Sequence, residues 1–267
     1  MIPGSASRRF SIALWILSAA LLIPKPGLAF CHRIEVARAP LSRVALGNSP
    51  AVRIQWFGHS TFQITSSRGT RILTDPHQRD DLPWPTLPQD IVTTSHNHGA
   101  HSNIWMARGN PEVLEGLKPD DNWRVIHRVI RDVAVYTVPA YHDKSQGLQR
   151  GKNSIFIFRV DDICIAHLGD LGHRLTPQQL QIMGQIDVLL VPLAGGMFTI
   201  TALEAREVTL QVKPRIAIPM HFWWEGAVES FVEDKLPVKR MNGTTLTIGK
   251  AELPHPTQVF VLTWLDP

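Results

Sequence analysis

The 267-residue sequence contains only two cysteines, Cys31 and Cys164. Their neighbours show no ligand spacing, which excludes a metal site built from cysteine motifs. Two alternatives remain open for the pair. Export from the cytoplasm would permit a disulfide between them, whereas the apolar, strand-like run around Cys164 also suits a buried free thiol.

The sequence also has little net charge. Charged residues make up 19% of it and the formal net charge is +4, while residues 1–29 carry three basic residues and no acidic one. The remaining chain therefore carries only +1, which argues against a nucleic-acid-binding face. With 44% hydrophobic residues, the composition is typical of a folded globular domain rather than a disordered chain.

Near the N-terminus, the apolar run is too short to favour a membrane span. It covers residues 12–23, interrupted only by Ser18, follows Arg8 and Arg9, and precedes small residues at positions 27 and 29. This pattern is typical of a secretory signal peptide. We therefore expect a signal peptide at 1–29, a single domain at 30–267, and a periplasmic or other extracytoplasmic location. The alternative is an uncleaved N-terminal anchor, which would provide the only membrane contact.

Apolar periodicity and turn residues predict a layered α/β protein. Two helices are marked by their first residues. Thr176-Pro177 is typical of a helix start, and Thr201 with Glu204 forms a capping box. A further short helix is expected after Pro111, and two closing strands are expected from Thr244 onward. The other predicted strands are 52–56, 61–65, 71–74, 91–94, 133–138, 154–160, 163–166, 186–191 and 215–218.

Histidine is the residue type that stands out, with 12 copies. His96, His98 and His101 fall within six residues, directly after the buried strand predicted at 91–94. A rigid strand that ends in a tight loop can direct several side chains to one point. Because imidazole nitrogen binds zinc, iron, nickel and copper, this segment predicts a metal site.

Further residues of ligand type follow later strands. These are His142-Asp143, Asp170 in the segment His167-Leu168-Gly169-Asp170, and Met220-His221. A single such residue is more often structural than a ligand. Their recurrence at successive strand ends is informative, since α/β folds gather their sites there.

These segments resemble the metallo-β-lactamase superfamily. More narrowly, they are similar to the branch that contains L-ascorbate-6-phosphate lactonase and the N-acylphosphatidylethanolamine phospholipase D type. The resemblance implies a four-layer αββα sandwich with metals between the ends of its two sheets. The matching segments are Trp56-Phe57-Gly58-His59-Ser60-Thr61-Phe62, Leu73-Thr74-Asp75-Pro76, Ser95-His96-Asn97-His98-Gly99-Ala100-His101, His142-Asp143, Gly169-Asp170, Val191-Pro192-Leu193-Ala194-Gly195-Gly196 and Pro219-Met220-His221-Phe222.

The resemblance implies a metal-dependent hydrolase in which a metal-bound hydroxide cleaves an ester, lactone or phosphodiester bond. The cofactor would be one or two Zn²⁺ ions, with Mn²⁺ or Fe²⁺ as alternatives. The first ion would be held by His96, His98 and His142. The second would be held by His101 and His221, with Asp170 bridging the two.

One position departs from the family pattern His-x-His-x-Asp-His, because Ala100 replaces the aspartate, which is a metal ligand. The remaining set of His101, Asp170 and His221 could still hold a metal with open positions, could be weak and leave a one-metal enzyme, or could prefer a metal other than zinc. The alternative function is a non-catalytic periplasmic protein that binds a metal or another ligand on the same fold. Residues expected around the ligands, some of which could replace the carboxylate, are His59, Asp75, Asp143 and His173.

The substrate is expected to be a small or lipid-like molecule, because aromatic residues lie close in sequence to the site segments and could line an apolar pocket. Packing in the core or at the rim is the alternative role for them. The low charge disfavours the nuclease members of the superfamily, and the sequence predicts no particular oligomeric state. The aromatic residues are Trp84, Trp105, Phe198, Phe222, Trp223 and Trp224.

Overall fold

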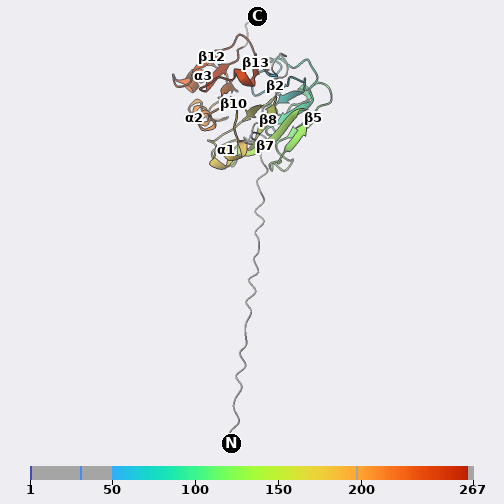
Figure 1. Ribbon diagram of the computed structural model, residues 1–267, viewed down its shortest axis with the longest axis vertical. Helices are drawn as coiled ribbons and strands as arrows, with labels where there is room; N and C mark the ends of the chain where they lie inside the picture. Colours follow the sequence, from blue (N-terminus) through green and yellow to red (C-terminus); the bar gives the residue numbers. More distant parts are fainter. Residues whose placement is uncertain (2–30, 32–49, 197, 264–267) are drawn as a thin grey trace.

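The computed structural model describes Met1, Cys31, residues 50–196 and residues 198–263. Two β-sheets pack face to face within these residues, and helices cover one side (Figure 1). The signal peptide or anchor expected at 1–29 lies outside the described residues. Among the described residues, no helix has the length and apolar character needed to cross a bilayer.

The first sheet has six strands in the order β13-β1-β2-β3-β4-β5. Strands β1 to β3 form an antiparallel meander, and β4 and β5 continue it in parallel. The bounds are β1 Ala51–Trp56, β2 Phe62–Thr65, β3 Arg71–Thr74, β4 Ile91–Thr94, β5 Glu112–Glu115 and β13 Thr245–Gly249.

The second sheet has eight strands in the order β12-β14-β11-β10-β9-β8-β7-β6. Strands β9, β10, β11, β14 and β12 run parallel, whereas β6, β7, β8 and β9 pair antiparallel. The bounds are β6 His127–Ile130, β7 Val133–Tyr141, β8 Lys152–Val160, β9 Ile163–His167, β10 Val188–Pro192, β11 Ile216–Met220, β12 Val238–Arg240 and β14 Gln258–Val261.

Alternating side chains of the two sheets build the central core. Ile54, Ile64 and Ile72 of the first sheet pack in one cluster with Phe156 and Ile165 of the second. Successive side chains of a strand point to opposite faces of its sheet. The eight-stranded sheet therefore has a second apolar set of side chains on its outer face. That set packs against three helices, α1 Pro177–Met183, α2 Ala202–Val212 and α3 Glu225–Val232.

The outer face of the six-stranded sheet has a thinner cover. Leu73 and Val92 pack there against Met106 of the 3-10 helix η1, Ile104–Met106, and against Trp84 of the preceding loop. The layered metallo-β-lactamase fold expected from the sequence is therefore confirmed, with its outer layer reduced to a short helix and a loop on this side.

Most predicted elements are present, and both predicted helix starts carry their capping boxes at Thr176 and Thr201. The short helix expected after Pro111 is wrong, because Glu112–Glu115 is strand β5. Parallel pairing with β4 supplies the backbone hydrogen bonds of this segment, so tertiary context overrides its local sequence. Helix α3 was not predicted.

Cys31 and Cys164 form a disulfide with a Cα–Cα distance of 6.0 Å. Both residues are buried in the core beneath the helices, and the Cys31 carbonyl accepts a hydrogen bond from the Gln185 amide at 3.1 Å. Of the two alternatives for this pair, the structure selects the disulfide. It joins residues 133 positions apart and fixes Cys31 to strand β9.

Removal of this cross-link is expected to destabilise the protein, because the unfolded chain regains the freedom of a long loop. Cys31→Ala and Cys164→Ala should each lower the free energy of unfolding by about 2–5 kcal/mol. Urea unfolding of the oxidised proteins measures the change. The double variant should lose no more than either single variant. Additive losses would show that the two side chains act separately.

Candidate metal centre

Six strand ends deliver the polar cluster, and these strands run in one direction within each sheet. Because parallel strands end at one edge, the residues that follow them meet between the two sheets. The residues and the strands that they follow are His59 after β1, Asp75 after β3, His96 after β4, His142 after β7, Asp170 after β9 and His221 after β11.

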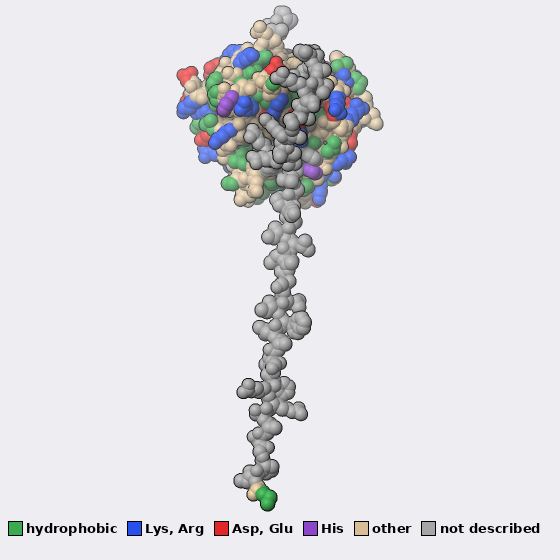
Figure 2. All heavy atoms as spheres, in the orientation of Figure 1, with side chains coloured by type: hydrophobic (Ala, Val, Ile, Leu, Met, Phe, Trp, Pro, Cys, Tyr) green, Lys and Arg blue, Asp and Glu red, His purple; other side chains and the backbone are tan. Residues whose placement is uncertain are grey.

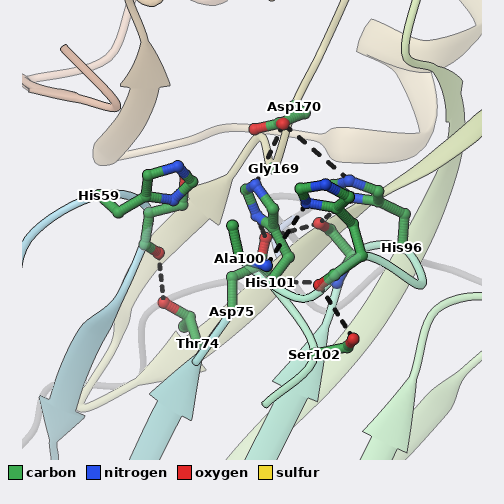
Figure 3. Close-up of polar contacts among 12 residues, drawn as sticks. His59, Thr74, Asp75, His96, Ala100, His101, Ser102, Gly169 and Asp170 are labelled. Atoms are coloured by element: carbon green, nitrogen blue, oxygen red, sulfur yellow. Dashed lines mark hydrogen bonds and ion pairs between the residues drawn. The ribbon is translucent and has the colours of Figure 1, made fainter. Parts of the chain in front are cut away.

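The carboxylate of Asp170 is the centre of the cluster (Figure 3). Its Oδ2 lies 3.0 Å from Nε2 of His142 and 3.1 Å from Nε2 of His101. Nε2 of His96 is 4.0 Å from the same oxygen, and Nε2 of His221 is 3.4 Å from Oδ1. Four imidazoles from the segments after three strands, β4, β7 and β11, therefore aim the same ring nitrogen at one carboxylate.

Within the described residues, three groups have ligand atoms close enough to share a metal ion. Their members are His96, His142 and Asp170; His96, His98 and His101; and His59, His101 and His221. In each group the ligand atoms lie within 4.8 Å of one another, and all these side chains except His98 are buried. The structure thus brings together all six ligands expected from the sequence and adds His59.

Burial and mutual charge keep several of these imidazoles neutral, as metal binding requires. Burial, with a contribution from His101, lowers the pKa of His96 to about 3. The pKa of His59 is far below its ordinary value for the same reason, reinforced by His221 and His101. Both rings therefore offer a lone pair across the physiological pH range.

The carboxylate remains ionised. Burial alone would raise the pKa of Asp170, but the charges of His101 and His221 and hydrogen bonds from the imidazoles outweigh it and hold the pKa well below its usual range. Burial likewise disfavours a charged His101, but Asp170 and Asp75 outweigh it and raise its pKa to about 10. A proton and a metal ion therefore compete for His101.

Asp75 orients two of the imidazoles. Its oxygens accept hydrogen bonds from Nδ1 of His101 at 2.9 Å and from the Ser95 hydroxyl at 2.5 Å. Because the Ser95 proton is donated to Asp75, the Ser95 oxygen accepts from Nδ1 of His96, 3.0 Å away. Both rings are thereby held with Nδ1 turned toward these partners and Nε2 turned toward Asp170. Ser95 itself was not singled out in the sequence.

Unpaired buried atoms indicate that the cluster is built to hold a cation. Among the described residues, neither Oδ1 of Asp170 nor Nδ1 of His59 has a hydrogen-bond partner. Buried polar atoms are normally paired, so each exception calls for an explanation. A set of neutral imidazoles around one carboxylate suits zinc, iron and other transition ions. The residues present therefore fit the metal that the sequence predicts.

Two residues expected near the ligands have structural contacts instead. The Asp143 carboxylate accepts backbone N–H groups of the loop that follows it, from residues 145, 147, 149 and 150 at 2.7–3.1 Å. These hydrogen bonds hold its pKa below the ordinary value despite the opposing effect of burial. Nε2 of His173 accepts from the Tyr141 amide, and its Nδ1 lies 2.7 Å from the Arg174 carbonyl.

Asn153 positions Asp170 and was missed in the sequence. Its side-chain oxygen accepts from the Asp170 amide at 3.0 Å, and its amide group donates to the Leu168 carbonyl at 2.9 Å. Gly169, at φ +55°, leaves room for it, because a Cβ there would lie 2.4 Å from the Asn153 oxygen. An asparagine inside strand β8 carries no sequence signal for this role.

The aromatic residues near the site divide into three groups. Phe222 stacks on Trp56 at a ring distance of 5.6 Å, and Trp84 packs under the first sheet, so both serve packing. Trp223 lies at the cluster, 5.5 Å from the ring of His59, and carries the Arg79 guanidinium 5.3 Å above it. The three others, Trp105, Phe198 and Trp224, are exposed.

Comparison with known proteins finds relatives that are described as metal-dependent hydrolases. A family model described as a β-lactamase superfamily domain matches residues 53–221. A UPF0173 metal-dependent hydrolase of Pyrococcus horikoshii is 28% identical over 197 residues, which cover 64% of this chain and 84% of that protein.

Solved structures agree with the family match. A protein of Thermotoga maritima, described as a Zn-dependent hydrolase of the metallo-β-lactamase superfamily, is 34% identical with a TM-score of 0.62, covering 79% of this chain and 98% of that one. A metallo hydrolase from Ignicoccus hospitalis shares the fold, with 20% identity, a TM-score of 0.55 and coverage of 74% and 98%.

The role of Asp75 can be measured by metal affinity. Asp75→Asn replaces one acceptor oxygen by a donor, so it leaves His101 or Ser95 without its partner. We expect Zn²⁺ binding to weaken about 10–100-fold, as on loss of other partners behind metal ligands. Competition with a fluorescent chelator measures the dissociation constants. The control is Asp132→Asn, whose carboxylate contacts Thr70 instead. Equal weakening in both variants would contradict the assignment.

Proposed function

The chain belongs to the metallo-β-lactamase superfamily of metal-dependent hydrolases, and we propose that it is an exported member which cleaves an ester, lactone or phosphodiester bond. The convergence of four histidine Nε2 atoms on the buried Asp170 carboxylate is the observation that carries this proposal. A purely structural cluster would not need four imidazoles around one carboxylate.

In this proposal the site holds two metal ions. His96, His98 and His142 would hold the first and His101 and His221 the second, and Asp170 contacts histidines of both sets. When bound, such ions supply a nucleophilic water at neutral pH and polarise the bond to be cleaved. The Asp170 carboxylate contacts histidines of both sets, since Oδ2 lies close to His142 and His101 and Oδ1 lies close to His221.

The protein contributes orientation and charge. Asp75 and Ser95 fix the rings of His101 and His96, so that the site is organised before an ion arrives. The ionised Asp170 supplies the negative charge that offsets part of the charge of two divalent cations. The sandwich core beneath excludes water from one side of the cluster.

Export is supported by two features. The Cys31–Cys164 disulfide is the kind of cross-link that persists in oxidising compartments and is rare in the cytosol. Residues 1–29 have the sequence pattern of a secretory signal. We therefore propose a periplasmic or other extracytoplasmic enzyme.

The substrate that we propose is a small or lipid-like molecule. Trp223 offers an aromatic surface directly beside His59 and His221, and the Arg79 guanidinium, which is also paired with Asp81, lies above it. This pair suits a ligand with an apolar part and a negative group, as in the lactonase and phospholipase D branch that the sequence resembles. On the face shown in Figure 2, basic and acidic side chains are interspersed, which favours a small molecule over a nucleic acid.

Hydrolysis of aryl ester, lactone and aryl phosphodiester reporters tests this function. We expect turnover of at least one reporter, its loss with a chelator, and its recovery on addition of Zn²⁺, Mn²⁺ or Fe²⁺. His142→Ala should lower kcat at least about 100-fold, because removing a metal ligand sacrifices several kcal/mol of transition-state stabilisation.

His127→Ala is the matched control, because His127 is an exposed histidine in β6, outside the cluster. It should retain full activity and metal content. Chelator-insensitive turnover would contradict the proposal. Two bound metals without turnover of any reporter class would favour the non-catalytic binding protein instead.

A further inference from the structure

We propose that His59 takes the ligand position that Ala100 leaves open in the second metal site. That site would then consist of His59, His101 and His221 with the Asp170 carboxylate. This inference rests on the proposed two-metal function and specifies which residues form the second site, namely three histidines and one carboxylate. It also accounts for how the chain tolerates the loss of a family ligand.

The site needs a replacement because a methyl group cannot coordinate a metal. Without the missing aspartate, His101, His221 and Asp170 supply only three ligands. Asp75 does not fill the gap, since its two oxygens are engaged by His101 and by Ser95. Asp143 does not fill it either, since its carboxylate is enclosed by backbone amides of the loop 145–150.

His59 is placed where the fourth ligand is needed. Its ring centre lies 3.8 Å from that of His221 and 4.8 Å from that of His101. One ligand atom from each of these three histidines falls within 4.8 Å of the others. In the view of Figure 3, Ala100 lies between His59 and His101, and His59 stands on the opposite side of His101 from His96.

The backbone holds His59 in this place by an unusual conformation. His59 and His221 both have left-handed φ angles, +51° and +52°, which residues with a side chain seldom adopt. The His59 carbonyl accepts hydrogen bonds from the His221 amide at 3.1 Å and from the Trp56 indole at 3.0 Å. Such conformations gather at functional sites, and this one fixes the two rings beside each other.

The buried His59 side chain has ring contacts but no hydrogen-bond partner among the described residues. The residue is only 7% exposed, and its Nδ1 is buried without a hydrogen bond. An imidazole that only held the loop would be expected to bond the backbone, as His77 does to the Phe57 carbonyl at 3.0 Å. A metal ion would give the His59 ring the partner that it lacks.

This composition predicts a metal preference. A neutral imidazole in place of a carboxylate makes the second site less negative by one charge and richer in nitrogen. Nitrogen ligands suit Zn²⁺, Fe²⁺ and Co²⁺, whereas Mn²⁺ and Mg²⁺ prefer oxygen. The second site should therefore bind Zn²⁺ in preference to Mn²⁺, and Ala100→Asp should reduce that preference.

Metal content per chain after reconstitution with Zn²⁺, measured by elemental analysis, tests the inference. We expect two equivalents in the unaltered protein and one in His59→Ala. The double variant His59→Ala/Ala100→Asp should regain the second equivalent, because the carboxylate returns to its family position. His173→Ala is the matched control, since both its ring nitrogens contact backbone atoms, and it should keep two equivalents.

Titration of the metal-free proteins with Co²⁺ gives a second readout that does not depend on turnover. His59→Gln keeps a polar side chain of similar reach and guards against misfolding of the alanine variant. The second Co²⁺ should bind this variant more than about 100-fold more weakly. This loss of affinity exceeds the one expected when a residue that only hydrogen-bonds a metal ligand is replaced. The visible absorption of the second Co²⁺ should differ from that of the unaltered protein.

The outcomes separate the two proposals. Two equivalents in both His59 variants, with unchanged Co²⁺ affinity and spectrum, would overturn the role of His59 and leave the two-metal hydrolase intact. One equivalent or none in the unaltered protein would overturn the two-metal function itself. A double variant that stays at one equivalent would also contradict the replacement of aspartate by His59.

Discussion

An ionised carboxylate inside a protein costs several kcal/mol unless opposite charge and hydrogen bonds surround it, and Asp170 is such a group. The rest of the site follows from that constraint. The segments after three strands bring four imidazoles to this carboxylate, and Asn153 of strand β8 holds its backbone. Removing any one partner leaves the charge less balanced. The cluster therefore functions as a unit that metal ions would complete.

The packed sheets provide the rigid support that this arrangement needs. The two sheets share one apolar core, and the eight-stranded sheet has a second core beneath the helices. On this rigid base, three non-glycine residues at the site, His59, Asp75 and His221, keep left-handed backbone angles. Strain of this kind persists only where the surroundings leave the chain no alternative. Short connections from buried strands meet that condition, and a long flexible loop would not.

The sequence allowed much of the centre to be predicted, because the ligands directly follow strands whose apolar pattern is easy to recognise. His96, His98 and His101 after β4, and His221 after β11, are found in this way. The role of His59 could not be chosen over that of Asp75, because it depends on contacts between segments distant in sequence. The pairing of the cysteines and the strand at Glu112–Glu115 likewise depend on tertiary neighbours rather than on local pattern.

The disulfide and the metal centre lie at opposite ends of strand β9. Cys164 is the second residue of β9, whereas Asp170 lies just beyond the last residue of the same strand. Cys31 is therefore fastened near the end of the strand remote from the histidines. A chain tethered through the segment before Cys31 would present its metal centre on the side away from the tether.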